Sequence, residues 1–147
     1  MEKKTSMTLE ELKEYTPIRD PYLMVSEIPE LKWGESAVGR FYIDPEMAVF
    51  KGHFPGDPTF PGIYTIEASS QVGAILVNTL DQYKGKVGLL LGVNKASFYK
   101  KIRPGDTMET HSRIAHIRED KAIVTIENKV YVDGELAAET AMAVAMR

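Results

Sequence analysis

The sequence predicts an α+β fold in which a curved antiparallel sheet of six strands wraps around one long central helix. Three observations support this prediction. The segment from Ala68 to Leu80 has no charged residue and is shorter than the roughly 18 apolar residues of a membrane span, which indicates a buried helix. Four strand-like segments follow this helix and two precede it. Such a sheet needs a cover for its apolar face, and the uncharged helix near residues 64–80 is the only candidate.

Local signals predict the elements before the central helix. Thr8 and Glu11 form the Ser/Thr-x-x-Glu pattern of a capping box, so a short helix is expected to begin there and to run until Pro17. A short strand is expected over residues 22–25 and a longer one over residues 36–43, with a Lys-Trp-Gly-Glu turn between them.

The chain after the central helix is expected to consist of strands. Asp133-Gly134 lies between the last two of them and supplies the positive φ angles of a tight hairpin turn. Apolar and polar residues alternate over residues 124–132, so this strand is expected to have one buried face. The four strands are predicted at residues 87–98, 107–117, 122–132 and 136–146.

Length and composition exclude several classes of protein. The 147 residues suit one domain, which is expected to span residues 1–147. The absence of cysteine excludes disulfide bonds, thiolate zinc sites and cysteine nucleophiles. A net charge of −3 argues against a broad affinity for nucleic acid or for an anionic membrane. The amino end is charged and polar, so no secretory signal is indicated and a cytoplasmic location is expected.

One histidine lies in a loop of constrained backbone. Residues 44–62 are rich in proline and glycine, which predicts an ordered loop rather than a flexible linker. His53 lies within this loop, and a lone histidine is more often a hydrogen-bonded structural residue than a catalyst. The proline-braced loop favours a general base here, because it fixes the direction of the side chain at a low cost in entropy.

Glu67 is the only charged residue in the helical segment that the sheet must cover. Burying a carboxylate without a partner favours its protonated form, which is the form that acts as a general acid. Alternatively, Glu67 marks the solvent-exposed end of the helix, where the helix dipole favours a carboxylate. Gln71 lies four residues later on the same helix face, where it either orients this acid or makes a hydrogen bond in the core.

The beginning of the helix offers a third chemical group. Pro61 is expected at the first helical position, and Gly62 beside it leaves backbone N–H groups unobstructed at the positive end of the helix dipole. Such N–H groups stabilise a developing oxyanion. A base, an acid and an oxyanion donor within fifteen residues predict proton abstraction next to a carbonyl group.

The remaining polar residues give weaker signals. His111 and His116 are expected on opposite faces of a strand because their separation is odd, so they cannot form a local metal pair. No metal site and no glycine-rich nucleotide-binding motif is indicated, and no cofactor is expected. A basic cluster forms either a solvated strand face or a docking surface for an acidic partner. Its members are Lys95, Lys100, Lys101 and Arg103.

The stretch from Phe50 to Gln71, FKGHFPGDPTFPGIYTIEASSQ, closely resembles the signature of the (3R)-hydroxyacyl-[acyl carrier protein] dehydratases of type II fatty acid synthesis. These are the FabZ-like enzymes of the hotdog family. A His-Phe-Pro, a following Pro-Gly and a carboxylate fourteen residues after the histidine form a specific signal. The resemblance extends to residues 19–25, 91–98 and 103–106 and so covers most of the chain.

The resemblance implies a hotdog fold and the reversible dehydration of (3R)-3-hydroxyacyl-acyl carrier protein to trans-2-enoyl-acyl carrier protein in fatty acid biosynthesis. In the family pattern His53 removes the proton at C2, and Glu67 protonates the departing 3-hydroxyl directly or through a water. The Gly62 N–H polarises the thioester carbonyl, and the Leu91 carbonyl orients the His53 ring. The residues expected to line the acyl tunnel or to orient the substrate are Phe60, Pro61, Gln71, Leu91 and Gly92.

The resemblance also implies partners. It predicts a homodimer or a trimer of dimers, in which His53 of one subunit meets Glu67 of another. The basic cluster becomes the expected docking surface for the acidic acyl carrier protein, which bears a phosphopantetheine-linked acyl chain. Two alternatives remain open, a non-catalytic acyl-thioester-binding hotdog protein and a hotdog thioesterase or hydratase that acts on coenzyme A thioesters.

Three positions depart from the family pattern and bear on chain-length preference rather than on the reaction. Ile18 stands where a histidine is common, Phe60 where an aliphatic residue is common, and Ser69-Ser70 where alanine or bulkier residues are usual.

Overall fold

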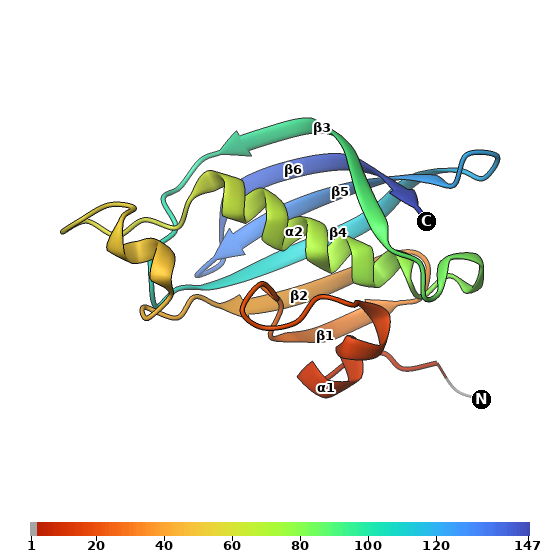
Figure 1. Cartoon of the computed structure of the whole chain (residues 1–147), viewed down its shortest axis with the longest axis horizontal. Helices are drawn as coiled ribbons and strands as arrows, with labels where there is room; N and C mark the ends of the chain where they lie inside the picture. The colour runs from red at the N-terminus through yellow and green to blue at the C-terminus, as the bar shows by residue number, and fades with distance from the viewer. Residues whose placement is uncertain (1–2) are drawn as a thin grey trace.

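The central helix α2 (Gly62–Val77) lies across one face of a six-stranded sheet that curves around it (Figure 1). A computed structural model describes residues 3–147 of the chain. In the sheet the strand order is β1-β2-β4-β5-β6-β3, and neighbouring strands are antiparallel. The predicted fold class is therefore confirmed. The strands are β1 (Glu27–Lys32), β2 (Ser36–Tyr42), β3 (Gly88–Phe98), β4 (Thr107–Arg118), β5 (Ile123–Val132) and β6 (Glu135–Met146).

The predicted amino-terminal helix is present and capped. The Glu11 backbone N–H donates to Thr8 Oγ1 at 3.3 Å, and the Thr8 N–H donates to Glu11 Oε1 at 3.1 Å, which completes the capping box. None of the helices within residues 3–147 has the length and apolar character needed to cross a membrane. The short helices are α1 (Leu9–Leu12), η1 (Lys13–Tyr15), η2 (Ala48–Lys51) and η3 (Asp81–Tyr83).

The prediction of a strand at residues 22–25 is wrong, because the first strand, β1, begins only at Glu27. The backbone of residues 22–24 bonds to a side chain instead of to a neighbouring strand. The Met24 N–H donates to Gln71 Oε1 at 2.6 Å, and the Tyr22 carbonyl accepts from Gln71 Nε2 at 3.0 Å. This segment is therefore an irregular strap that lies against α2.

The four strands after α2 confirm the prediction to within one residue at each end. Asp133 and Gly134 have φ angles of 51° and 75°, as the predicted hairpin turn between β5 and β6 requires. On β5 the buried residues alternate with less buried ones, so this strand presents one face to α2.

The prediction that His111 and His116 lie on opposite faces of their strand is wrong. His111 pairs with Lys129 and His116 pairs with Thr125, and both partners lie on the outer face of β5. The cause is a β-bulge between Ile114 and His116, where one extra residue shifts the alternation of β4 by one position. Both histidines are therefore exposed on the outer face of the sheet.

Helix α2 packs closely against the sheet. A Cβ on Gly73 would lie 2.7 Å from Ile126 Cγ2, and a Cβ on Gly39 would lie 2.5 Å from Val72 Cγ2. A larger residue at either glycine would push the helix away from the sheet. The absence of a side chain at Gly73 thus permits the close approach of α2 to β5.

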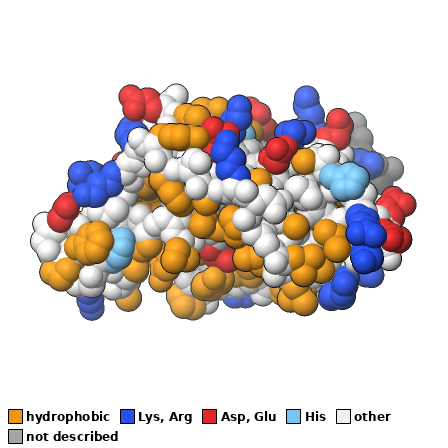
Figure 2. Space-filling model, turned by 90° about the horizontal axis from the view of Figure 1, so that it is seen from above, with side chains coloured by type: hydrophobic (Ala, Val, Ile, Leu, Met, Phe, Trp, Pro, Cys, Tyr) orange, Lys and Arg blue, Asp and Glu red, His pale blue; other side chains and the backbone are white. Residues whose placement is uncertain are grey.

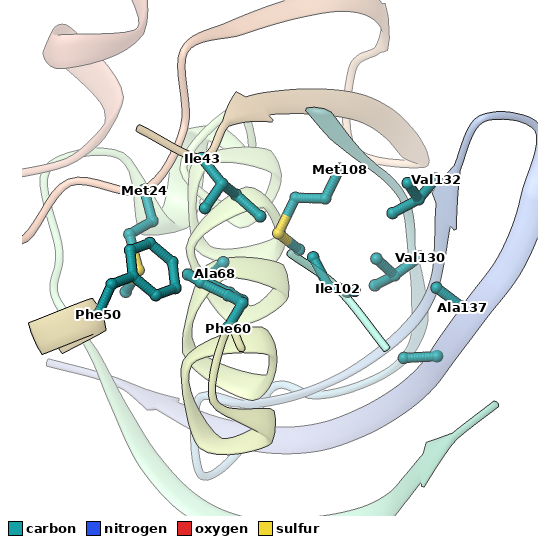
Figure 3. Close-up of a cluster of buried hydrophobic side chains, with 11 residues drawn as sticks. Met24, Ile43, Phe50, Phe60, Ala68, Ile102, Met108, Val130, Val132 and Ala137 are labelled. Atoms are coloured by element: carbon teal, nitrogen blue, oxygen red, sulfur yellow. The ribbon is translucent and has the colours of Figure 1, made fainter. Parts of the chain in front are cut away.

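A hydrophobic cluster holds both ends of the loop between β2 and α2 (Figure 3). Phe50 and Phe60 are buried in this cluster, with their ring centroids 6.5 Å apart, and Ala68 of α2 belongs to it as well. Burying one phenylalanine side chain contributes about 1.5–3 kcal/mol to stability. The loop between the two rings is thus fixed at both ends, as its proline and glycine content predicted.

Candidate active site

His53 is held in one tautomer by the loop that carries it. Its Nδ1 lies 2.8 Å from the Thr59 carbonyl oxygen. Because a carbonyl only accepts hydrogen bonds, Nδ1 carries the proton, and Nε2 of the neutral ring is left with a free lone pair. The ring also stacks on Phe54, with centroids 4.0 Å apart. A neutral imidazole with a fixed Nδ1–H and a free Nε2 is suited to act as a general base.

Backbone hydrogen bonds fix the loop around His53. The His53 N–H donates to the Val49 carbonyl at 3.0 Å, and the Thr59 N–H donates to the His53 carbonyl at 2.9 Å. Phe54 and Asp57 exchange two backbone hydrogen bonds of 3.2 and 3.0 Å. Sequence reasoning did not single out Thr59, because its contact with the ring depends on the path of the loop rather than on a motif.

Glu67 lies in the second turn of α2, where it is half-buried and bound by Gln71. Gln71 Nε2 donates to Glu67 Oε2 at 3.0 Å and also to the Tyr22 carbonyl at 3.0 Å. Its Oε1 accepts from the Met24 N–H at 2.6 Å. Gln71 is 3% exposed, so it orients Glu67 and also makes core hydrogen bonds, which unites the two roles considered for it.

The helix begins at Gly62, one residue later than predicted, and Pro61 is its N-cap. The Pro61 carbonyl accepts from the Tyr64 and Thr65 N–H groups at 2.9 and 3.1 Å. The hydrogen bonds of residues 3–147 include none from the Gly62 N–H, which stands at the positive end of the helix. This N–H is suited to receive a developing oxyanion.

A hollow of about 330 Å³ opens beside Gly62. The Phe98 ring at the end of β3 forms one wall, and it lies 3.2 Å from where a Cβ of Gly62 would be. A larger hollow of about 610 Å³ lies on the outer face of the sheet, but of the predicted site residues only Lys95 lines it. Of these two hollows, Gly62 lines only the smaller one. Its lining includes Thr59, Phe60, Thr65, Tyr99 and Ile102.

The predicted acid and base are not joined within one chain. His53 bonds to Thr59 and Glu67 bonds to Gln71, and no hydrogen bond or ion pair of residues 3–147 links His53 to Glu67. The loop of residues 44–61 extends away from the amino end of α2 (Figure 1). Phe60 is 3% exposed, so within the chain it is a core residue.

Leu91 and Gly92 lie on β3, at the edge of the sheet. Leu91 and Asn94 are the extra residues of two β-bulges, and β3 pairs only with β6. Within this chain Thr59, not Leu91, orients the His53 ring. Figure 2, viewed from the β3 side, shows hydrophobic side chains spread over the middle of this face. Between residues 87 and 98 the exposed large hydrophobic residues are Val87, Leu89, Leu90, Leu91, Val93 and Phe98.

The predicted basic cluster is paired with carboxylates. Lys101 Nζ and Arg103 share Asp57 of the His53 loop at 3.0 and 3.4 Å. The hydrogen bond from Lys101, together with the charges of Lys101 and Arg103, lowers the pKa of Asp57. Lys95 pairs with Glu139 and Lys100 pairs with Glu135, both at 3.2 Å. Four cations therefore share three carboxylates. Exposed pairs of this kind are weak and are screened by salt.

Within residues 3–147 no group of three or more histidine, aspartate or glutamate side chains is placed to hold a metal ion. The candidate catalytic groups of this chain are the His53 ring, the Glu67 carboxyl group and the Gly62 N–H.

Comparison with known proteins identifies the family. The model of the FabA-like domain matches residues 16–141. The chain belongs to the FabA-like family. A relative from Clostridium botulinum strain Loch Maree, named 3-hydroxyacyl-[acyl-carrier-protein] dehydratase FabZ, is 38% identical over 134 residues, which cover 88% of this chain and 93% of the relative. A relative of the same name from Thermomicrobium roseum is 40% identical over 129 residues, which cover 88% of this chain and 85% of that relative.

A solved structure supports the fold. The dehydratase heterocomplex ApeI:P from Xenorhabdus doucetiae matches with a TM-score of 0.76 and 13% identity over 92% of this chain and 90% of that chain. At that identity the likeness bears on the fold alone. Together with the FabA-like match, it confirms the hotdog fold, and the FabZ relatives confirm the resemblance found in the sequence.

Proposed function

We propose that the protein catalyses the reversible dehydration of (3R)-3-hydroxyacyl-acyl carrier protein to trans-2-enoyl-acyl carrier protein in fatty acid biosynthesis. The observation that carries this proposal is the tautomer of His53, whose Nδ1–H is fixed on Thr59 and whose Nε2 is free to take a proton. Glu67 and Gly62 supply the acid and the oxyanion donor. The FabZ relatives, at 38–40% identity over 88% of the chain, support the same reaction. A cytoplasmic location is part of this proposal.

The proposed reaction assigns each bond change to one group. His53 Nε2 takes the proton from C2 while the Gly62 N–H donates to the thioester oxygen, where negative charge develops. The C3–O bond breaks as Glu67 protonates the departing hydroxyl, and water leaves as the C2=C3 double bond forms. His53 then holds one extra proton and Glu67 lacks one, so returning that proton to Glu67 completes the cycle.

The proposed active unit is a homodimer, alone or within a trimer of dimers, because the pair of catalytic groups is incomplete in one chain. The edge of β3 has unpaired backbone groups and an exposed apolar surface, which is a template for pairing with another strand. Pairing of β3 with β3 of a second copy would cover this surface. In that assembly His53 of one subunit meets Glu67 of the other, and the Leu91 carbonyl becomes available to the site.

The reaction is tested by supplying one 3-hydroxyacyl chain on two carriers. We expect an enoyl thioester to form, with kcat/KM about 10-fold higher for the acyl carrier protein thioester than for the coenzyme A thioester. Ultraviolet absorbance of the conjugated product measures the rate. Release of free thiol without enoyl product would instead favour the thioesterase alternative. Tight ligand binding without turnover would favour the non-catalytic alternative.

The basic cluster is the proposed docking surface for the acyl carrier protein. Replacing Lys100 and Lys101 with glutamate is expected to raise KM for the carrier-linked substrate about 10-fold, and to leave KM for a small thioester unchanged. Asp57→Asn is expected to lower KM for the carrier-linked substrate, because it removes the carboxylate that already occupies Lys101 and Arg103.

A matched control for this charge reversal lies at the β4–β5 turn, at the opposite end of β4 from Arg103. Arg118 and Lys121 are exposed there and lie outside the basic cluster, so their replacement with glutamate changes the net charge equally. If this control variant raises KM as much as the Lys100 and Lys101 variant does, or if both substrates respond equally, docking at the basic cluster is contradicted.

A further inference from the structure

The hydroxyl of Thr65, near the start of α2, has no partner within the chain. Thr65 is 1% exposed, and the hydrogen bonds of residues 3–147 include none to or from its Oγ1. A threonine inside a helix often bonds back to a carbonyl of the preceding turn. Here the Pro61 carbonyl accepts from the Tyr64 and Thr65 N–H groups instead. Ser69, one turn further along α2, does bond back, and its Oγ donates to the Ile66 carbonyl at 3.0 Å.

Thr65 lines the hollow of about 330 Å³ that opens beside Gly62. The two residues are three positions apart, so they lie on the same face of α2. Helical side chains lean towards the amino end of their helix, so the Thr65 side chain covers the turn that begins with Gly62. Gly62 has no side chain to separate the two groups. Its N–H and the Thr65 hydroxyl therefore open into the same hollow.

The Thr65 hydroxyl remains accessible from this hollow. Within residues 3–147 the fully enclosed side-chain nitrogen and oxygen atoms without a partner are Ser112 Oγ and Asn128 Oδ1. Thr65 Oγ1 is not one of them, so it keeps contact with solvent. The aromatic rings of Phe60 and Phe98 also line the hollow. A single polar group in a largely apolar wall typically orients the ligand that enters.

Resting on the proposed function, we propose that Thr65 is a further catalytic residue, whose hydroxyl donates to the thioester oxygen beside the Gly62 N–H. As the proton leaves C2, negative charge develops on that oxygen, and preorganised donors directed at it stabilise the transition state. A hydroxyl hydrogen rotates to suit its partner, so Thr65 Oγ1 can direct it towards this charge. The thioester oxygen then has two donors, one from the backbone and one from a side chain of α2.

The first test removes only the hydroxyl. Thr65→Val is expected to lower kcat about 10-fold and to leave KM for the carrier-linked substrate within about 2-fold, because the lost donor acts on the developing charge. Thr65→Ser keeps the hydroxyl and should retain kcat within about 3-fold. The unfolding temperature of Thr65→Val should not fall, because the hydroxyl has no partner in the folded chain. An unchanged kcat for Thr65→Val, or equal losses in both variants, would overturn the proposal.

Thr110→Val is the matched control. Thr110 is 2% exposed on β4 and does not line the hollow, so this variant also replaces a buried hydroxyl with a methyl group. Its kcat should equal that of the wild type. If Thr110→Val lowers kcat as much as Thr65→Val does, the loss comes from the packing of the core, and the proposed hydrogen bond is contradicted.

The second test does not depend on catalysis. The probe is butyryl-acyl carrier protein with an isotope-labelled thioester carbonyl, which has no 3-hydroxyl to lose. Hydrogen bonds to a carbonyl lower its stretching frequency, so the frequency of the bound probe should be higher in Thr65→Val than in the wild type or Thr65→Ser. Equal frequencies in the wild type and Thr65→Val would overturn the proposal. If the wild type forms no enoyl product, the proposed function fails, and the infrared spectrum alone decides whether Thr65 donates to the thioester.

Discussion

His53→Ala is expected to lower kcat for carrier-linked dehydration by about 10²- to 10⁴-fold, the range associated with loss of a general base. The alanine variant has no group that takes the C2 proton, while Gly62 and Glu67 remain in place. His53 is half-exposed, and the loop keeps its backbone hydrogen bonds and its two buried phenylalanine anchors. The variant should therefore stay folded. Steady-state rates, with circular dichroism and thermal unfolding on the same sample, measure both effects.

His111→Ala is the matched control for this experiment. His111 is exposed on the outer face of the sheet, where its Nε2 bonds to Glu109 at 2.8 Å, far from the proposed site in the fold. Its loss should leave kcat unchanged. A His53→Ala enzyme with near-normal rates would show that another group takes the proton, and the base assignment would be wrong.

Glu67→Gln is expected to have an effect of similar size, because an amide cannot deliver the proton that the departing hydroxyl needs. The glutamine has the same shape, and its carbonyl oxygen still accepts from Gln71 Nε2, so the strap of residues 22–24 stays attached to α2. The double variant His53→Ala/Glu67→Gln should lose little more activity than either single variant, since the two residues act as a unit. Near-normal rates for Glu67→Gln would contradict its role as the acid.

The sequence predicted the elements that follow a regular pattern. The strands after α2 alternate in burial, and Asp133-Gly134 has the φ angles of its turn, so both were recognisable locally. The strap of residues 22–24 was mistaken for a strand, because its backbone partner is the side chain of Gln71, nearly fifty residues along the chain. The bulge before His116 places this side chain on the opposite face of β4 from the one expected. No residue type in the sequence indicates such a bulge.

The candidate site, like the fold, has some features that the local sequence indicates and others that depend on contacts between distant segments. His53, Glu67 and Gly62 were found from a motif, but the contacts around them come from the fold. Thr59 holds the His53 ring through a backbone carbonyl, which every residue type offers. The Tyr22 carbonyl lies close to Glu67 because Gln71 Nε2 donates to both. Reasoning from one sequence finds the candidate catalytic groups and Gln71, but it misses the Thr59 carbonyl that holds the His53 ring.

The mixing of two inactive variants tests the shared site most directly. Equal amounts of His53→Ala and Glu67→Gln subunits, unfolded together and refolded, form mixed dimers in about half of all assemblies. If His53 of one subunit works with Glu67 of the other, each mixed dimer has one site with both native residues, and about a quarter of wild-type activity returns. Wild-type protein refolded in the same way sets the scale. If mixed dimers purified through two different tags stay as inactive as the separate variants, the site does not form between subunits, and the account is contradicted.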